Sequence, residues 1–530
     1  MGYSYWRGGR HLDPAEFELF FREAPFGGFG LFLGLGDCVR FLREFRFSTE
    51  DIEFLKSAMP SSTEEGFFHY LSTVDASGVT LWSFPEGSVV FAREPLMKVQ
   101  GPLLVVQLLE TTLLCLVNYA SLVGTNAARY RLAAGPDKKL VEMGLRRAQG
   151  PDGGLSASKY CYVGGFDLTS NVLAGKLFGV PLAGTVAHSY VSSFSSPDDV
   201  TPMTLTPAKG QGEGVDLLDL STRYLKEVCE VIEVPRDGTK SEELAAFVSY
   251  AVSFPHNFLM VLDTYNVMSS GVPNFCAVAR ALHHLGYRAV GVRLDSGDLA
   301  RQSVEIRKIF KKCAERFGIP IFKDFTIAVS NNISETSMGR ISKENNEINV
   351  VGVGTHLVTC TQQPSLGCVY KLVQVNHIPC IKVSEDEEKT TIPGSKSVYR
   401  LYDNEGHPIL DLMAGADELP PVIGTELQCH KLGSNGEVEL VVPYKAELMH
   451  SIYFEGRGLS VMQDHCGETL PSLQKIRDHA RRSIEILSPE HRNLEKPEPY
   501  RVAVTEKLHK LLLRLRGTSP LDRDLPRNGC

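Results

Sequence analysis

A group of charged side chains follows an apolar run in the segment AVGVRLDSGDLA, residues 289–300. The run has the composition of a buried parallel strand, but it ends in Arg293, Asp295 and Asp298 before a helical pattern begins. Arg293 and Asp295 are two residues apart, so both side chains leave a strand on the same face. A guanidinium and a carboxylate placed in this way suit an anionic substrate, ribose hydroxyls or a magnesium ion. An internal salt bridge, with Asp298 as a helix cap, would account for the same residues.

Two further segments could bind phosphate. INVVGVGTHLV places Gly352, Gly354 and Thr355 where a strand meets a helix, and backbone N–H groups and the helix dipole hold phosphate in that geometry. A tight turn between strand and helix would use the same glycines. In GLRRAQGPDGG, Arg146 and Arg147 end a helical pattern before a Gly-rich stretch. They would either contact a diphosphate or remain solvated.

His188 is a candidate for proton or phosphoryl transfer. In GTVAHSYV it follows a strand pattern, with Thr185 and Ser189 nearby. A histidine at such a position is either structural or acts as a nucleophile or proton carrier. The triplet Ser330–Asn332 (SNN) ends another strand pattern and offers neutral hydrogen-bonding groups, or simply forms a turn that caps a helix.

The elements that position these residues repeat an apolar strand, a polar turn and a helix at residues 180–189, 258–264, 289–298, 326–332 and 348–355. Continuous apolar strands that alternate with helices predict a parallel sheet covered on both faces. The number of repeats favours an irregular, TIM-like α/β barrel over a doubly wound sheet. In both folds, ligands bind at the carboxyl ends of the strands. Residues 138–149 have a helical pattern, and residues 150–158 are expected to form a Gly-rich loop.

The two ends of the chain differ from this middle part, because short strands alternate with helices there. We expect an α+β domain in residues 1–125, which a strand-rich segment at 363–465 rejoins, and an α/β barrel with the active site in residues 126–362. Closing helices are expected at 466–516 and a disordered tail at 517–530.

Composition favours an enzyme that acts on small molecules. The net charge is −8 and the basic residues are dispersed, which disfavours nucleic acid as a partner. The 12 cysteines show no CxxC pair and no zinc-type spacing, as expected for reduced thiols in the cytosol. The start, MGYSYWRGGR, lacks the apolar core of a signal peptide. The most apolar run, residues 103–117, contains Gln107 and Glu110 and is expected to be a buried helix rather than a membrane span.

Taken in order, several segments resemble nicotinate phosphoribosyltransferases of the animal type, within the type II phosphoribosyltransferases: TNAARYRLAAG, MGLRRAQGPDGGLSAS, GGFDLTSNVLAG, GTVAHSYV, GVRLDSGDL, VSNNI, GVGT and SPEHRNL. The resemblance runs through essentially the whole chain. It implies an irregular α/β barrel with an α+β domain built from both chain ends. It also implies a homodimer with active sites at the subunit interface.

The resemblance implies a reaction that joins nicotinate to 5-phosphoribosyl 1-diphosphate, with Mg²⁺ or Mn²⁺, to give nicotinate mononucleotide and diphosphate. ATP hydrolysis is coupled to this step through a phosphohistidine, so the enzyme is classed as a C–N ligase. The reaction is the first step of NAD synthesis from nicotinate. By resemblance, His188 is the phosphorylated histidine, Thr185 and Arg293 contact nicotinate, and Asp295 and Asp263 are acids near the ribose and magnesium, with Asp295 as a magnesium ligand.

The phosphoribosyl diphosphate site is implied at Thr355, Gly352, Gly354 and Arg146. The chemistry agrees with these assignments, since breaking the bond from C1 to diphosphate places negative charge on the leaving group, which arginines and magnesium stabilise. A phosphorylated histidine adds charge and acceptor oxygens beside that site.

Two features of the sequence bear on the rival functions that remain open. Nicotinamide-specific relatives carry an aspartate near Asn171, and the asparagine would remove a charge that repels nicotinate. Relatives begin with a TDLYQ-like segment whose tyrosine stacks on nicotinate, and this chain begins at MGYSYW, so that contact is expected to be missing. The rivals are a nicotinamide phosphoribosyltransferase, a noncatalytic paralogue that binds pyridine nucleotides, and a barrel lyase that uses Asp295 and His188.

Overall fold

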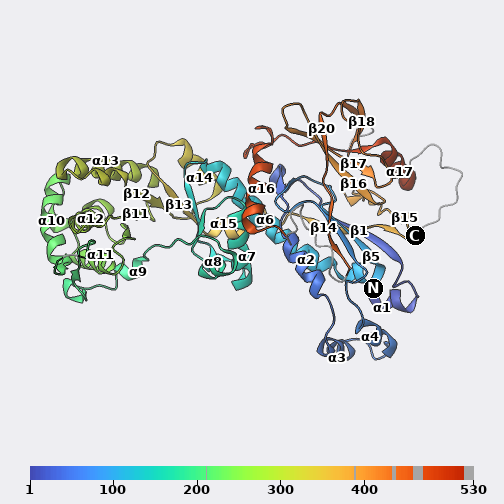
Figure 1. Cartoon of the computed structure of the whole chain (residues 1–530), viewed down its shortest axis with the longest axis horizontal. Helices are drawn as coiled ribbons and strands as arrows, with labels where there is room; N and C mark the ends of the chain where they lie inside the picture. The colour runs from blue at the N-terminus through green and yellow to red at the C-terminus, as the bar shows by residue number, and fades with distance from the viewer. Residues whose placement is uncertain (211, 387–388, 433–436, 457–469, 518–530) are drawn as a thin grey trace. The chain divides into compact units, whose positions relative to one another are not determined.

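The computed structural model describes residues 1–210, 212–386, 389–432, 437–456 and 470–517. The chain forms two compact units, of which the first combines residues 1–126 with the segment from residue 360 onward and the second comprises residues 127–359 (Figure 1). The divisions expected from the sequence lie after residues 125 and 362. Apart from Gly517, the expected disordered tail lies outside the described residues.

A parallel six-stranded sheet forms the centre of the second unit. Its order is β10-β11-β12-β13-β6-β7, and all neighbouring strands are parallel. Apolar residues such as Val292, Ile327 and Val351 are fully buried in it, as expected of strands covered on both faces. The strands are β6 (Lys139–Glu142), β7 (Leu168–Thr169), β10 (Leu259–Val261), β11 (Gly291–Leu294), β12 (Thr326–Val329) and β13 (Val350–Val353).

Helices connect these strands, and α13 (Leu299–Phe317) illustrates why they form. Its apolar residues recur on one face, where Ile306 and Phe310 are fully buried, Asp298 caps its first turn, and Gly318 ends it with a left-handed φ of 68°. The other helices of this unit are α7 (Gly150–Val163), α8 (Val172–Phe178), α9 (His188–Val191), α10 (Leu217–Ile232), α11 (Ser241–Ser253), α12 (Val272–His284), α14 (Glu335–Lys343) and α15 (Thr355–Thr359), and a short hairpin joins β8 (Thr204–Leu205) to β9 (Val215–Asp216).

The sheet is open in its backbone pairing. Within the described residues no ladder joins β7 to β10. The predicted mixed α/β class is therefore confirmed, but the predicted TIM-like barrel is not. Beyond β7, Thr169 makes one parallel bridge to Leu182. The predicted strand at residues 180–189 is therefore reduced to this bridge and the short helix α9.

Two local predictions were wrong. Residues 138–149 were expected to form a helix, but they form β6 and a short 3₁₀ turn, Leu145–Arg147. The residues that looked helical, Leu140 and Val141, are buried between two parallel strands. Residues 150–158 were expected to be a loop but begin α7. A proline in the first turn is compatible with a helix, and a side chain at Gly154 would place its Cβ 2.5 Å from Leu145.

Both chain ends build the first unit. Its first sheet has the order β15-β14-β1-β5-β3-β21, so the amino-terminal strands β1, β5 and β3 lie between carboxyl-terminal strands in one antiparallel sheet. Phe17, Leu19 and Phe21 on β1 point into its core. The strands are β1 (Pro14–Phe21), β3 (Thr80–Ser83), β5 (Met97–Pro102), β14 (Cys368–Val375), β15 (Ile378–Pro379) and β21 (Ser451–Glu455), while β2 (Gly30–Leu31) pairs separately with β4 (Val89–Val90).

A second six-stranded sheet completes this unit in the order β19-β18-β22-β17-β16-β20, with only the β17–β22 pair parallel. Its strands are β16 (Lys396–Tyr402), β17 (Pro408–Gly415), β18 (Leu427–Lys431), β19 (Val438–Val441), β20 (Lys445–Leu448) and β22 (Val502–Thr505). The helices of the unit are α1 (Gly2–Arg7), α2 (Leu35–Glu44), α3 (Thr49–Ala58), α4 (Glu65–Leu71), α5 (Leu103–Leu108), α6 (Glu110–Ala134, which crosses the division), α16 (Leu473–Glu485) and α17 (Glu506–Arg516). The segment 466–516, expected to form closing helices, thus also contains the strand β22. Ala503 and Val504 of this strand are both buried, and the strand lies between β17 and β18.

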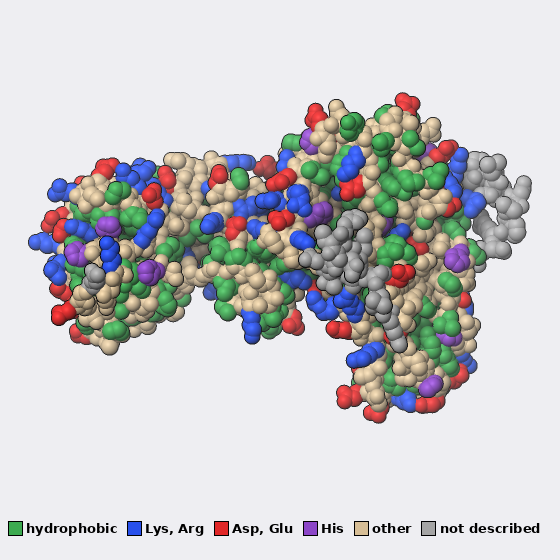
Figure 2. All heavy atoms as spheres, in the orientation of Figure 1, with side chains coloured by type: hydrophobic (Ala, Val, Ile, Leu, Met, Phe, Trp, Pro, Cys, Tyr) green, Lys and Arg blue, Asp and Glu red, His purple; other side chains and the backbone are tan. Residues whose placement is uncertain are grey.

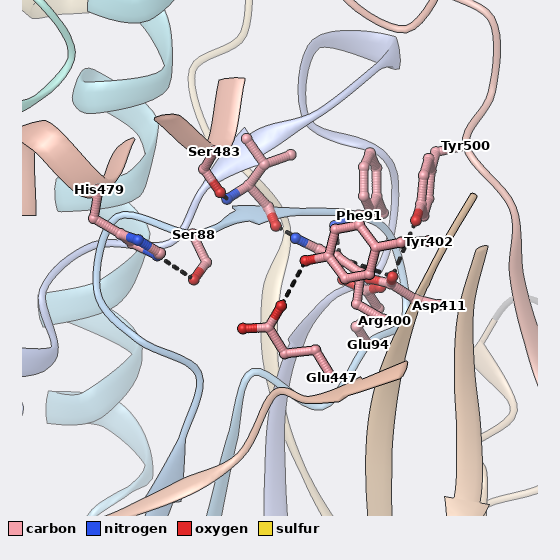
Figure 3. A network of polar contacts seen from close by, with 11 residues as sticks. Ser88, Phe91, Glu94, Arg400, Tyr402, Asp411, Glu447, His479, Ser483 and Tyr500 are labelled. Carbon is pink, nitrogen blue, oxygen red and sulfur yellow. Dashed lines mark hydrogen bonds and ion pairs between the residues drawn. The ribbon is translucent and has the colours of Figure 1, made fainter. Parts of the chain in front are cut away.

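A buried charge network ties the two ends of the chain together inside the first unit (Figure 3). Arg400 of β16 lies opposite Asp411 of β17 and donates to it through Nε and Nη2, and Nη2 also donates to the carbonyl of Val89. Tyr500 donates to the same carboxylate at 3.1 Å. Burial and the adjoining Asp411 raise the pKa of Glu94, which favours a carboxylic acid that can share its proton with that aspartate.

None of the helices in the described part of the chain combines the length and the apolar character needed to cross a membrane. The run at residues 103–117, expected to be a buried helix, forms α5 and the start of α6. Leu103, Leu104, Val106, Leu109 and Leu113 of this run are buried.

Candidate active site

The candidate site lies at the carboxyl ends of the parallel strands of the second unit. Asp263 follows β10, Asp295 follows β11, Ser330 follows β12 and Gly354 follows β13. Because the strands are parallel and neighbouring, their carboxyl ends meet along one edge of the sheet. The fold therefore brings together polar residues that are distant in the sequence.

His188, the first residue of α9, contacts two of these strand ends. Its Nδ1 lies 3.2 Å from the hydroxyl of Thr264, and its Nε2 lies 3.4 Å from Oδ2 of Asp295 and 3.8 Å from Oδ1 of Asp263. The hydroxyl can donate or accept, so either tautomer of the ring is satisfied at Nδ1. The side chain is 39% exposed, which leaves the ring accessible to a ligand.

The two aspartates differ in their environment. Asp295 is 29% exposed, and its Oδ1 accepts a hydrogen bond from Ser330 at 2.7 Å. The side chain of Asp263 is 5% exposed, and its Oδ2 accepts a hydrogen bond from Ser296. Its Oδ1 is buried and has no hydrogen-bond partner among the described residues. A buried carboxylate oxygen without a donor is costly, so this atom suits a cation or a donating ligand.

The protein holds the guanidinium of Arg293 in place but does not use all of its hydrogen-bonding capacity. Its Nη2 donates to the carbonyl of Val186 at 3.3 Å and lies 3.9 Å from Oδ2 of Asp295, while its Nε is buried and has no partner within the described part of the chain. Burial lowers the pKa of Arg293. The carboxylates of Asp295 and Asp263 oppose that shift, and the positive charge of Arg146 adds to it. A planar donor group with an unused N–H suits a carboxylate or another oxyanion.

A cavity of about 260 Å³ joins these features. Its polar walls come from strand ends that follow β6, β11, β12 and β13. The lining residues are Met143, Arg146, Arg147, Arg293, Asp295, Ser330, Asn331, Asn332, Gly352, Gly354 and Thr355. The structure therefore brings six predicted residues together here: Arg146, Arg293, Asp295, Gly352, Gly354 and Thr355. Neither Arg146 nor Arg147 forms an ion pair with a described residue.

Three predicted residues lie outside this lining. His188 lies 3.4 Å from Asp295, which lines the cavity, and Asp263 lies 3.8 Å from His188. Thr185 is half-buried in the segment before α9 and does not line the cavity. Its neighbour Val186 is the residue that accepts a hydrogen bond from Arg293.

The glycines of the GVGT segment allow the backbone to approach closely. A Cβ at Gly352 would lie 2.7 Å from the sulfur of Met143, and one at Gly354 would lie 3.1 Å from the Met143 carbonyl. Thr355 follows as the first residue of α15. These glycines therefore let β13 pack against the turn that follows β6, which carries the two arginines.

Two residues at the end of β12 have unusual backbone conformations. Asn331 has φ of 131° and Asn332 has φ of 48°, and both line the cavity. Left-handed φ values are uncommon outside glycine, although asparagine tolerates them best, and they concentrate at functional sites. The SNN triplet is thus more than a helix-capping turn, since the cap of α14 is Ser334.

Met143, Ser296 and Thr264 are site residues that sequence reasoning missed. Each follows a strand by a few positions, or precedes a helix, at the carboxyl edge of the sheet. Met143 comes directly after β6, so its place at the carboxyl edge would have followed if residues 139–142 had been recognised as a strand. Ser296 and Thr264 adjoin the predicted residues Asp295 and Asp263.

The described residues contain no cluster of three or more His, Cys, Asp or Glu side chains arranged to hold a metal ion. Mg²⁺, however, is commonly held by one or two carboxylates together with substrate phosphates. Asp263 and Asp295 both approach Nε2 of His188, and Asp263 has an unused buried oxygen. The donor set therefore fits Mg²⁺ bound together with a phosphorylated ligand.

Asn171 is part of a separate network at the end of β7. Its Oδ1 accepts from the backbone N–H of Ala174, as an N-cap of α8, and its Nδ2 donates to Ser158 at 3.1 Å. The residue is 3% exposed and is absent from the lining of the cavity. Both ends of the amide are thus engaged within the protein.

Comparison with known proteins gives a consistent result. The family model described as nicotinate phosphoribosyltransferase N-terminal domain matches residues 1–118, and the corresponding C-terminal domain matches residues 395–512. Proteins named nicotinate phosphoribosyltransferase from Bos taurus and Homo sapiens are 53% and 52% identical to this chain, over 98% of this chain and 96% of each relative.

Solved structures agree with these matches. The crystal structure of human nicotinic acid phosphoribosyltransferase superimposes with a TM-score of 0.88 and 50% identity, covering 97% of this chain and 98% of that chain. A nicotinate-nucleotide pyrophosphorylase from Pyrococcus furiosus, with a TM-score of 0.54 and 17% identity over 91% of this chain and 92% of its own, shares the fold alone. On the near-complete match to relatives about half identical, this chain belongs to the nicotinate phosphoribosyltransferase family.

Proposed function

We propose that this chain is an ATP-dependent nicotinate phosphoribosyltransferase, which forms nicotinate mononucleotide and diphosphate from nicotinate and 5-phosphoribosyl 1-diphosphate. The observation that carries the proposal is the cavity, in which Arg146, Arg147 and Arg293 meet Asp295 and the glycine turn at adjoining strand ends. Three cationic side chains around 260 Å³ suit a substrate with several phosphates and a carboxylate. Family membership supports the same reading.

Each residue then has a role in the transfer. The backbone at Gly354 and Thr355 would hold the 5-phosphate, and Arg146 with Arg147 would hold the diphosphate. Arg293 would pair its unused Nε–H with the carboxylate of nicotinate. The bond from C1 to diphosphate breaks, the nicotinate nitrogen forms the new bond to C1, and the arginines stabilise charge on the leaving diphosphate. Asp263 and Asp295 would hold a Mg²⁺ or Mn²⁺ ion, whose charge would also stabilise that leaving group.

His188 is the residue that we propose to couple ATP hydrolysis to this transfer. An unprotonated ring nitrogen would take the γ-phosphoryl group of ATP, so that a P–N bond forms, the P–O bond breaks and ADP leaves. Water later cleaves the P–N bond and returns phosphate and the free imidazole. The 39% exposure of the ring and the hydrogen-bonding hydroxyl of Thr264 support this role. It would place the enzyme among C–N ligases, at the first step of NAD synthesis from nicotinate.

A homodimer with shared active sites is also proposed. Helix α8 leaves Val172, Leu173 and Leu177 more than half exposed, and neighbouring Leu182 is 50% exposed. Hydrophobic side chains are visible over this part of the molecule in Figure 2. Adjacent exposed apolar residues beside a site are typical of a protein interface. Light scattering on the purified chain would give the oligomeric state, and a monomer at all concentrations would contradict this part of the proposal.

We place the enzyme in the cytosol, because none of the ten cysteines that the structure describes forms a disulfide. The deciding assay for function uses the purified chain with phosphoribosyl diphosphate and Mg²⁺, with nicotinate or nicotinamide, and with or without ATP. We expect nicotinate mononucleotide as the product and a rate that ATP increases. Preference for nicotinamide would favour the rival transferase, and the absence of both products would favour a noncatalytic protein.

The phosphohistidine role has its own test. His188→Ala should abolish ATP hydrolysis and its stimulation of synthesis, while some ATP-independent synthesis remains. The control is His283→Ala, which changes an exposed histidine at the end of α12. An acid-labile phosphoprotein that still forms from ATP in the His188 variant would show that another residue accepts the phosphoryl group.

A further inference from the structure

Glu142, the last residue of β6, is a buried carboxylate that the proposed chemistry does not use. It is 1% exposed, and within the described residues it makes no ion pair with a lysine or arginine. A buried carboxylate is costly unless donors surround it. Three donors do so: the backbone N–H of Gly144 on Oε1, and the hydroxyls of Ser158 at 2.8 Å and Thr169 at 2.5 Å on Oε2.

These donors come from three different parts of the second unit. Gly144 opens the 3₁₀ turn that carries Arg146 and Arg147, Ser158 lies on α7, and Thr169 ends β7. One side chain therefore joins the turn after β6 to the helix that follows it and to the neighbouring strand. The network extends one step further, because Nδ2 of Asn171 donates to the hydroxyl of Ser158.

The turn itself is confined on its other side. A Cβ at Gly144 would lie 2.3 Å from Cγ1 of Val358 on α15, and the Gly144 carbonyl accepts the backbone N–H of Arg147 at 2.8 Å. Met143, immediately before it, donates its N–H to the carbonyl of Val353 at 2.8 Å. The backbone of the turn is thus held between Glu142 and α15, and its position decides where the arginine side chains enter the cavity.

We propose that Glu142 is a positioning residue, which fixes the turn that carries Arg146 and Arg147 and thereby sets the affinity of the site for a diphosphate group. The inference rests on the proposed function for the identity of the substrate, phosphoribosyl diphosphate. It does not rest on that function for the binding of diphosphate itself. Two long, flexible cationic side chains bind an oxyanion well only when their backbone is already placed.

A positioning role and a purely structural role predict different results. If Glu142 only stabilised the fold, its loss would lower stability and affect both substrates alike. If it positions the two arginines, the Michaelis constant for phosphoribosyl diphosphate should rise while that for nicotinate changes little. Glutamine at this place keeps one acceptor for Gly144, and its amide can donate to the hydroxyls of Ser158 and Thr169, which can rotate to accept.

The experiment compares Glu142→Ala, Glu142→Gln and Thr169→Val in the full chain. Calorimetry with inorganic diphosphate and Mg²⁺ gives a Kd that does not depend on turnover. We expect Glu142→Ala to raise that Kd and the Michaelis constant for phosphoribosyl diphosphate by about tenfold, with the constant for nicotinate within about twofold. Thr169→Val, which removes one donor, should raise the Kd by about threefold, and Glu142→Gln should remain within about threefold of the parent.

The matched control is Asp167→Ala. Asp167 accepts from the backbone N–H of Leu140 at 2.8 Å, near the amino end of the same strand, and pairs with Arg131. This variant should lose stability without a change in diphosphate affinity. An unchanged Kd in Glu142→Ala, or equal changes for both substrates, would overturn the positioning role. If Glu142→Ala does not fold, the Kd of Thr169→Val decides by itself, and an unchanged value overturns the role.

The outcomes also separate this inference from the proposed function. A parent chain that binds diphosphate but makes no nicotinate mononucleotide would contradict the function, while the ratio of Kd values between parent and Glu142 variants would still test the positioning role. An active parent with unchanged Kd values in those variants would contradict the positioning role alone.

Discussion

Arg400 in the first unit and Arg293 in the second are both buried arginines beside an aspartate, but their hydrogen bonding differs. Arg400 donates to both oxygens of Asp411 and to a backbone carbonyl, and its side chain is 3% exposed (Figure 3). Arg293 is 12% exposed, and among the residues that the structure describes it makes one hydrogen bond and has a buried Nε–H without a partner. Its nearest carboxylate, Asp295, lies 3.9 Å away.

The electrostatics of the two arginines diverge accordingly. Burial alone would lower the pKa of each guanidinium. At Arg400 the ion pair with Asp411 outweighs burial, and the pKa is raised. At Arg293 burial outweighs Asp295 and Asp263, and the pKa is lowered. A saturated network stabilises the fold, whereas donors left unpaired beside a cavity are available to a ligand, at a cost in stability that the rest of the unit must offset.

The largest effect that this comparison predicts is on stability. Asp411→Ala leaves Arg400 as a buried charge without its partner, and removing one member of such a pair costs about 3 to 5 kcal/mol. We expect a loss of that size in the free energy of unfolding measured in urea. Asp295→Ala, at the open site, should change it by less than about 1 kcal/mol. Equal losses in the two variants would show that saturation does not distinguish the two networks.

Glu243 on α11 is intermediate between these cases, and it predicts a pH dependence. It is fully buried, its Oε2 accepts from Ser270 and Asn274, and its Oε1 has no hydrogen-bond partner in the part of the chain that the structure describes. Burial raises its pKa to about 7 from an ordinary value of 4.5. Between these two values the folded chain keeps a proton that the unfolded chain releases, so stability falls as pH rises through this window.

Glu243→Gln removes that titration and should flatten the stability profile between pH 4.5 and about 7. The variant should match the parent near the lower limit and exceed it above the upper limit by at most about 3 kcal/mol. Urea denaturation at a series of pH values would measure the difference. A difference that stays constant with pH would mean that Glu243 remains ionised throughout.

Arg293→Lys tests the open site itself. An ammonium keeps the charge but cannot present two parallel donors to a carboxylate, and one charge-assisted hydrogen bond contributes about 1.5 to 3 kcal/mol. We expect kcat/KM for nicotinate to fall by about one to two orders of magnitude, with little change in thermal stability. Arg400→Lys should do the reverse. An Arg293 variant within about twofold of the parent would show that this guanidinium does not contact the substrate.

The sequence predicted much of the open site because strand-end residues carry their own signals. Arg293, Asp295, Gly352, Gly354 and Thr355 follow apolar runs that are unmistakable, and the structure collects all of them at one cavity. Family resemblance, rather than periodicity, supplied the assignments to individual substrates. The buried charge network of the first unit was not predicted. Strand pairing places Arg400 opposite Asp411, but Glu94 and Tyr500 come from distant parts of the sequence and reach this pair only in the folded structure.

The errors in secondary structure have physical causes. β6 has four residues, and Lys139 and Glu142 at its ends gave it the appearance of an amphipathic helix, although the sheet buries its centre on both faces. Glycines in residues 150–154 suggested a loop, but Gly154 lies in α7, where it allows the helix to pack closely against Leu145 of the preceding turn. Neither outcome could be predicted from local propensity, because tertiary contacts decide both.

Asn171 gives the smallest predicted effect. A variant at this position tests whether selectivity for nicotinate over nicotinamide comes from the cavity or from the hydrogen-bonded network of Asn171, Ser158 and Glu142. Its amide is 3% exposed and bonded at both ends, to Ala174 and to Ser158, and Ser158 in turn donates to Glu142. In Asn171→Asp the helix cap is retained, but the donor to Ser158 is lost and two carboxylates then face one hydroxyl. We expect a loss of about 1 kcal/mol in stability.

Because Asn171 does not line the cavity, the ratio of kcat/KM for nicotinate to that for nicotinamide should change by less than about threefold. Asn171→Ser, which keeps a neutral cap, is the control. A shift of more than about tenfold toward nicotinamide in the aspartate variant alone would instead support the interpretation that a neutral side chain here prevents repulsion of the substrate carboxylate.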